Sequence, residues 1–68
     1  MMSALEARNH LSALEVERAL AGSTALAGVD VYMADLEEEI AAWRSVYVGA
    51  AVTEIAALRG ELFGRQEG

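Results

Sequence analysis

The chain has 68 residues, is 54% hydrophobic and carries a formal net charge of −6 at pH 7. It has no cysteine and one histidine, His10, so disulfides, thiolate zinc sites and multi-histidine sites within one chain are excluded. The apolar fraction rules out a disordered chain, and the acidic balance disfavours direct nucleic-acid binding, so we expect a single folded domain over residues 1–68 without a cofactor.

The first predicted helix covers about residues 3–21. It begins at Ser3, whose hydroxyl can accept a hydrogen bond from the amide of Glu6 while the Glu6 carboxylate returns to the Ser3 amide. We expect it to end at Gly22, in the left-handed conformation that glycine adopts just past a helix.

This first helix carries two apolar stripes on roughly opposite sides. One contains Ala7, Leu11, Leu14 and Ala21, and the other contains Leu5, Ala13, Val16 and Leu20. An ordinary surface helix has one such stripe. The pattern therefore predicts a helix that lies between two neighbours.

Residues 22–28 form the connection, with a glycine at each end and Ser23 and Thr24 as potential caps, and Leu26 is expected to close the end of the bundle. A long helix is predicted over about residues 29–63, followed by a frayed tail at 65–68. Its apolar seam has spacings of three and four: Val29, Met33, Leu36, Ile40, Trp43, Tyr47, Ala51, Ile55, Leu58 and Leu62. The β-branched stretch 46–52 could also suit a strand, but it has no pairing partner in this chain, which favours helix.

These elements predict an all-α, two-helix antiparallel hairpin with a mismatch in length. Folded back, the short helix would cover the long one only from about Val29 to Tyr47. Residues 48–63 would stay uncovered, and an apolar patch of that size marks an association surface. We therefore expect a homo-oligomer, in the simplest case a two-fold dimer that forms a four-helix bundle. The expected interface comprises Trp43, Tyr47, Val48, Val52, Ile55, Leu58 and Leu62.

Two features of the long helix have alternative interpretations. The row Ala41, Ser45, Gly49, Thr53 and Ala57 has small residues at every fourth position, which favours a close helix contact but also arises by chance in alanine-rich sequences. Trp43 and Tyr47 fit either a core position or an anchor for a foreign protein.

The sequence offers little for chemistry. Glu6 and His10 are four residues apart on one helix face, but two ligands do not complete a metal site. There is no glycine-rich phosphate loop after a strand, and a hairpin could assemble no nucleophile–histidine–acid set. We expect a protein that is not an enzyme and holds no metal.

The acidic residues form the other candidate site: Asp30, Asp35, Glu37, Glu38 and Glu39. They fit an acidic DNA mimic that inhibits a nucleic-acid-binding protein. We favour the other interpretation, a solvated surface that complements the helix dipole and keeps the protein soluble.

The expected location is the cytoplasm. Residues 1–6 lack the cationic and apolar regions of a signal peptide. The uncharged apolar run at residues 45–53, which Arg44 and Glu54 bracket, is far shorter than the ~20 residues needed to span a bilayer.

The C-terminal third carries a resemblance. Residues 43–68, in particular YVGAAVTEIAALRGEL and the glycine-bearing tail, resemble the C-terminal ends of small uncharacterised proteins of actinobacteriophages, especially mycobacteriophages. The resemblance implies an accessory protein made inside a bacterial host. It supplies no activity and no site residues.

The leading hypothesis for function is a non-enzymatic, self-associating interaction protein that docks a helical surface on a host or phage protein. Two alternatives stay open, namely the acidic inhibitor described above and a structural subunit of a larger assembly.

Overall fold

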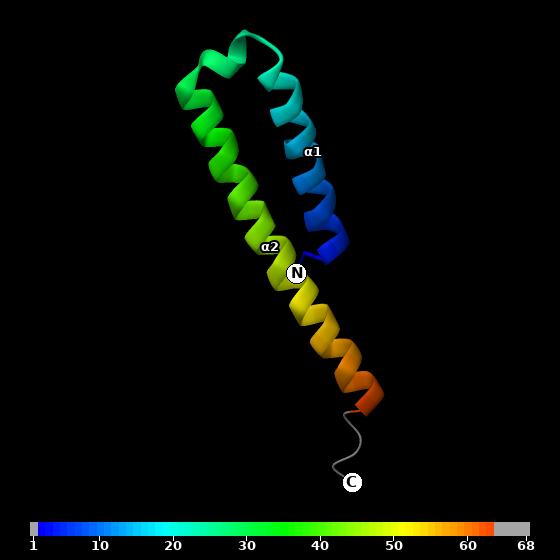
Figure 1. Cartoon of the computed structure of the whole chain (residues 1–68). Coiled ribbons are helices and arrows are strands. Elements are labelled where there is room, and N and C mark those ends of the chain that lie inside the picture. Colours follow the sequence, from blue (N-terminus) through cyan, green and yellow to red (C-terminus); the bar gives the residue numbers. More distant parts are fainter. Residues whose placement is uncertain (1, 64–68) are drawn as a thin grey trace.

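The computed structural model describes residues 2–63, with side chains described to Glu61, and within this range the chain is an antiparallel helical hairpin (Figure 1). Helix α1 comprises Ala4–Gly22, a short 3-10 turn η1 comprises Ala25–Gly28, and helix α2 comprises Asp30–Phe63. The predicted all-α hairpin and both of its helices are therefore confirmed. The predicted tail at 65–68 lies outside the described residues.

The predicted N-terminal cap of α1 is confirmed. The Ser3 hydroxyl accepts a hydrogen bond from the Glu6 amide at 3.1 Å, and Glu6 Oε1 accepts one from the Ser3 amide at 3.0 Å. This reciprocal pair satisfies two amides that the first turn of a helix leaves without partners.

The prediction for the end of α1 is wrong at Gly22. Gly22 is the last residue of the helix, and no residue in the described range has a positive φ. The Ser23 and Thr24 hydroxyls instead donate hydrogen bonds to the carbonyls of Leu20 and Ala21, both at 2.9 Å. Thr24 Oγ1 also accepts from the Leu26 amide, so hydroxyl caps and the η1 turn replace the left-handed glycine.

The core lies between the two helices, close to the connecting turn. Leu11 of α1 packs against Leu36 and Ile40 of α2, and these three are 9%, 4% and 2% exposed. Leu14, Tyr32 and Trp43 pack around this cluster, and Ala7 and Ala21 are buried along the same side of α1. Residues 46–52 are helical, as favoured over the strand.

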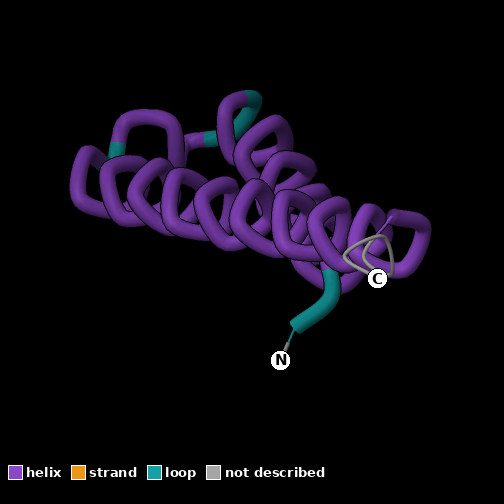
Figure 2. Tube along the Cα trace, turned by 90° about the horizontal axis from the view of Figure 1, so that it is seen from below, coloured by secondary structure: helices purple, strands orange, loops and turns teal. Residues whose placement is uncertain are grey.

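The two helices overlap further than the sequence suggested. The Ala4 amide donates a hydrogen bond to Glu54 Oε2 at 2.7 Å, so α1 reaches to Glu54 and not only to Tyr47. Residues 55–63 extend beyond this point. Figure 1 shows α2 continuing past the start of α1, and Figure 2 shows the hairpin from below with its short connecting loops. The radius of gyration is 17.3 Å, against about 11 Å for a compact domain of this length, so the hairpin is a thin rod.

Candidate interaction surfaces

The plane that contains the two helix axes separates two different sides of the hairpin. Glu15 and Glu17 are two residues apart on α1, which corresponds to a rotation of about 200°. Glu17 therefore meets α2 on one side, where it accepts a hydrogen bond from the Tyr32 hydroxyl. Glu15 meets α2 on the other side, where Arg44 is its partner.

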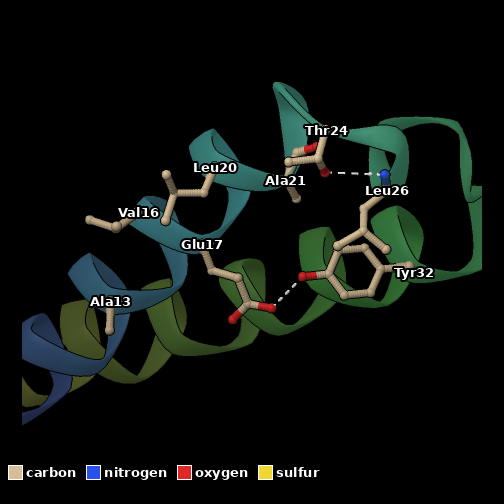
Figure 3. A pocket seen from close by; sticks show the side chains of 8 residues that line it. All are labelled: Ala13, Val16, Glu17, Leu20, Ala21, Thr24, Leu26 and Tyr32. Atoms are coloured by element: carbon tan, nitrogen blue, oxygen red, sulfur yellow. Dashed lines mark hydrogen bonds between the residues drawn. The ribbon is translucent and has the colours of Figure 1, made fainter.

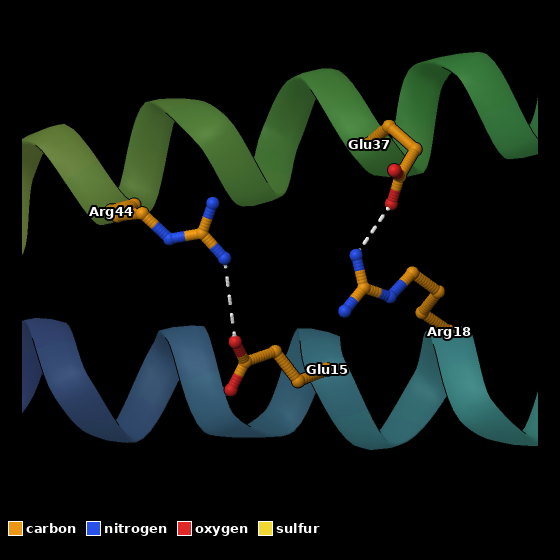
Figure 4. Close-up of polar contacts among 4 residues, drawn as sticks. All are labelled: Glu15, Arg18, Glu37 and Arg44. Atoms are coloured by element: carbon orange, nitrogen blue, oxygen red, sulfur yellow. Dashed lines mark hydrogen bonds and ion pairs between the residues drawn. The ribbon is translucent and has the colours of Figure 1, made fainter.

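The side with Glu15 is charged (Figure 4). Arg18 Nη1 lies 2.8 Å from Glu37 Oε1, and Arg44 Nη2 lies 3.6 Å from Glu15 Oε2. The hydrogen bond to Glu37 raises the pKa of Arg18. All four side chains are 40% exposed or more, so water screens these pairs and they align the helices more than they stabilise them.

The side with Glu17 is apolar (Figure 3). An open groove of about 410 Å³ lies beside the end of α1, lined by Ala13, Val16, Glu17, Leu20, Ala21, Thr24, Leu26 and Tyr32. The hydrogen bond to Glu17 raises the pKa of the Tyr32 hydroxyl, because ionisation would place a phenolate beside a carboxylate. Leu26, expected to close the end of the bundle, is 43% exposed and forms part of this groove.

Further along, the His10 and Trp43 rings are stacked, with centroids 4.3 Å apart and planes inclined by 9°. Trp43 also packs against the core, and Tyr47 is half-buried. Trp43 of the predicted interface therefore lies against α1 within the same chain.

The second stripe of α1 is exposed to solvent. Leu5, Val16 and Leu20 are 66%, 59% and 64% exposed. The surrounding arc of about 120° holds only uncharged residues: Leu5, Asn9, Ser12, Ala13, Val16, Ala19 and Leu20. We call this arc the outer face of α1. The charged residues of α1 all lie outside it, although charge is what an exposed helix surface normally carries.

A second exposed apolar surface lies on α2. The predicted interface residues Val48, Val52, Ile55 and Leu58 are 52%, 60%, 53% and 53% exposed. We call these four residues the distal face of α2. The side chain of Leu62, the last predicted member, lies outside the described range. The outer face of α1 was absent from the predicted interface, although its stripe was visible in the sequence.

The predicted acidic residues do not form one patch. Asp35, Glu38 and Glu39 line a shallow hollow with Ala42, whereas Glu37 faces Arg18 across the hairpin. Asp30 lies in the first turn of α2, where a helix favours negative charge.

The predicted row of small residues is exposed. Ala41, Ser45, Gly49, Thr53 and Ala57 all face solvent, and a Cβ at Gly49 would meet no atom within 4 Å. Met2 lies beside part of this row and forms a shallow hollow with Ser45, Val46, Gly49, Ala50 and Thr53.

Within residues 2–63, no helix combines the length and apolar composition needed to cross a membrane. In the same range, no three acidic or histidine side chains gather as metal ligands. No protein-family model matches the sequence, and no curated protein or solved structure is detectably similar to it.

Proposed function

We propose that the chain is a non-enzymatic interaction protein that works as a homo-oligomer, with the dimer as its smallest unit. One observation carries the proposal: eleven large apolar side chains are exposed in the described residues, whereas the buried core consists of five residues, two of them alanine. A monomer would leave most of its apolar side chains in water.

The exposed area supports association. The chain exposes 5123 Å², whereas a compact monomer of 7.2 kDa exposes about 4100 Å². The excess of about 1000 Å² is comparable to the ~800 Å² that each partner contributes to a standard interface. Each Leu, Val or Ile that becomes fully buried would contribute about 1.5–3 kcal/mol.

The same surfaces fit a further partner. A host or phage protein with an amphipathic helix would find on α1 or α2 the kind of surface that helix-in-groove recognition uses. We propose that this interaction takes place in the cytoplasm of a bacterial host, as the resemblance to actinobacteriophage proteins implies. The acidic-inhibitor alternative has less support, because Glu37 is paired with Arg18 and the acids are spread around α2.

Molar mass measured by light scattering over a range of concentrations tests self-association. We expect the wild-type mass to reach at least twice the 7.2 kDa of one chain. Ile55→Asp places a charge on the distal face of α2 and should return the protein to a monomer. Thr53→Asp adds the same charge on the other side of α2, away from that face, and should leave the mass unchanged.

Two results would contradict the proposal. One is a wild-type protein that stays at 7.2 kDa up to millimolar concentration with its helical circular dichroism intact. The other is an equal effect of the two aspartates, which would show that added charge acts without regard to the surface that receives it.

A further inference from the structure

The two exposed apolar surfaces differ from each other, which bears on how copies meet. Building on the self-association proposed above, we propose that they bind each other, so that the outer face of α1 in one copy receives the distal face of α2 from the next. This contact is head-to-tail: each copy offers one surface and keeps the other for a further neighbour.

One chain cannot bring these surfaces together by itself. Helix α1 packs on its own α2 through Leu11, and Ala7 and Ala21 are buried on the same side of α1, so the outer face lies on the opposite side. The distal face of α2 runs past the start of α1, which lies at Glu54. Both surfaces are therefore available to a second copy.

The distal face is shorter than the outer face and can lie within it. Leu5 and Leu20 are fifteen residues apart, and Val48 and Leu58 are ten residues apart. At 1.5 Å per residue, the outer face extends over about 22 Å and the distal face over about 15 Å. The groove between Leu20, Leu26 and Tyr32 continues the outer face at its C-terminal end and offers space for an additional side chain (Figure 3).

The charges along the edges favour one orientation. The outer face of α1 has Glu6 and Glu17 along one edge, and Arg8 and Glu15 along the other. The distal face of α2 has Arg59 between Val48 and Val52 on one side, and Glu54 and Glu61 along the opposite edge. Antiparallel helices bring together edges on the same rotational side of each face, whereas parallel helices bring together edges on opposite sides.

Antiparallel docking brings two pairs of opposite charges together and one pair of acids, Glu15 and Glu54. With Leu20 near Val48 of the next copy, Arg59 comes within reach of Glu6, and Arg8 within reach of Glu61. Parallel docking, with Leu5 near Val48, would bring Glu15 near Arg59 but Glu17 near Glu61, so it forms only one pair of opposite charges. Within residues 2–63, Arg18 and Arg44 form ion pairs inside the hairpin, but Arg8 and Arg59 form none.

The orientation has a consequence for assembly. A distal face that runs antiparallel to α1 runs parallel to the α2 of the receiving copy, so the two hairpins point the same way and are displaced along their length. The same contact can then repeat from copy to copy and produces a ring or a filament.

Mixing two blocked variants tests this arrangement. Val16→Asp blocks the outer face, and Ile55→Asp blocks the distal face, at side chains that are 59% and 53% exposed and outside the core. Each variant alone should be a monomer of 7.2 kDa. An equimolar mixture should form a 1:1 complex of twice that mass that grows no further, because only one intact pair of surfaces remains.

Val16→Asp mixed with Leu20→Asp is the matched control, because both substitutions block the outer face and no intact pair remains. This mixture should stay monomeric. Circular dichroism and Trp43 fluorescence establish that each variant keeps the hairpin. Arg8→Glu and Glu61→Arg should each weaken association by about two- to five-fold, and the double variant should restore it.

The results separate this inference from the proposed function. If the wild type associates and the complementary mixture stays monomeric, the contact is not head-to-tail, although self-association stands. A Val16→Asp variant that still dimerises likewise excludes the outer face. A wild type that is monomeric contradicts self-association itself.

Discussion

The two sides of α1 contain similar apolar residues, but one side is buried and the other is exposed. The inward side carries Leu11 between two alanines and is buried against α2. The outward side carries Leu5, Val16 and Leu20, which remain 59–66% exposed. The difference shows that apolar periodicity predicts that a helix face will be buried. The length of the chain decides whether the same chain buries it.

The largest effect is expected when one leucine on each side of α1 is replaced by alanine and the losses of unfolding free energy are compared. Leu11→Ala removes a side chain that packs on Leu36 and Ile40, and we expect it to cost about 2–5 kcal/mol of unfolding free energy. That approaches the whole stability expected of a chain of this size, so the variant should be largely unfolded.

Leu20→Ala is the control, because Leu20 is 64% exposed. Its unfolding free energy should stay within about 0.5 kcal/mol of wild type, while self-association weakens. Urea denaturation followed by circular dichroism, at a dilution where both variants are monomeric, measures the first effect. Equal losses of stability would show that both sides of α1 are buried in the folded chain.

The fold could be predicted from the sequence because its determinants are local. The Ser3–Glu6 cap and the spacing of apolar residues in α2 depend on neighbours three or four positions away, and both were confirmed. Gly22 was predicted wrongly because the hydroxyls of Ser23 and Thr24 offered another way to satisfy the last carbonyls. The overlap of the helices was underestimated because it depends on a distant contact. Glu54 accepts a hydrogen bond from the Ala4 amide and is fifty residues away from Ala4 in sequence.

The candidate surfaces could be predicted only in part. The exposed positions of Ile55 and Leu58 follow from the difference in helix length, whereas Val48 and Val52 lie within the overlap of the helices and are exposed because they face away from α1. Trp43 shares their seam, but its environment depends on His10, which meets it only through tertiary packing. The absence of charge on the outer face of α1 was visible in the sequence, but only the structure shows that this face lies away from α2.

A smaller effect is expected from the aromatic pair on the inward side. His10→Ala removes the ring that stacks on Trp43 and should cost about 0.5–1.5 kcal/mol of unfolding free energy. Trp43 is the only tryptophan, so its emission reports this site directly and should shift to longer wavelength as water reaches the indole. Asn9→Ala, one position away on the outer face, should change neither quantity. An unchanged emission in the His10 variant would contradict the stacking.

The smallest effect is expected at the N-terminal cap of α1, formed by Ser3 and Glu6. Hydrogen bonds with Ser3 hold the pKa of Glu6 below its ordinary value of 4.5. A carboxyl whose pKa is lower in the folded state stabilises the fold above its unfolded-state pKa, and this contribution disappears as the pH falls through the folded-state value. Glu6→Gln should therefore have a lower melting temperature than wild type at pH 7, and this difference should narrow as the pH falls below 4.5.

Glu38→Gln is the control, since within residues 2–63 the Glu38 side chain forms no hydrogen bond or ion pair. The difference in melting temperature between this variant and wild type should not narrow in this way. Melting curves followed by circular dichroism measure both, and a Glu6→Gln difference that persists unchanged in acid would show that the carboxylate charge does not stabilise the start of α1.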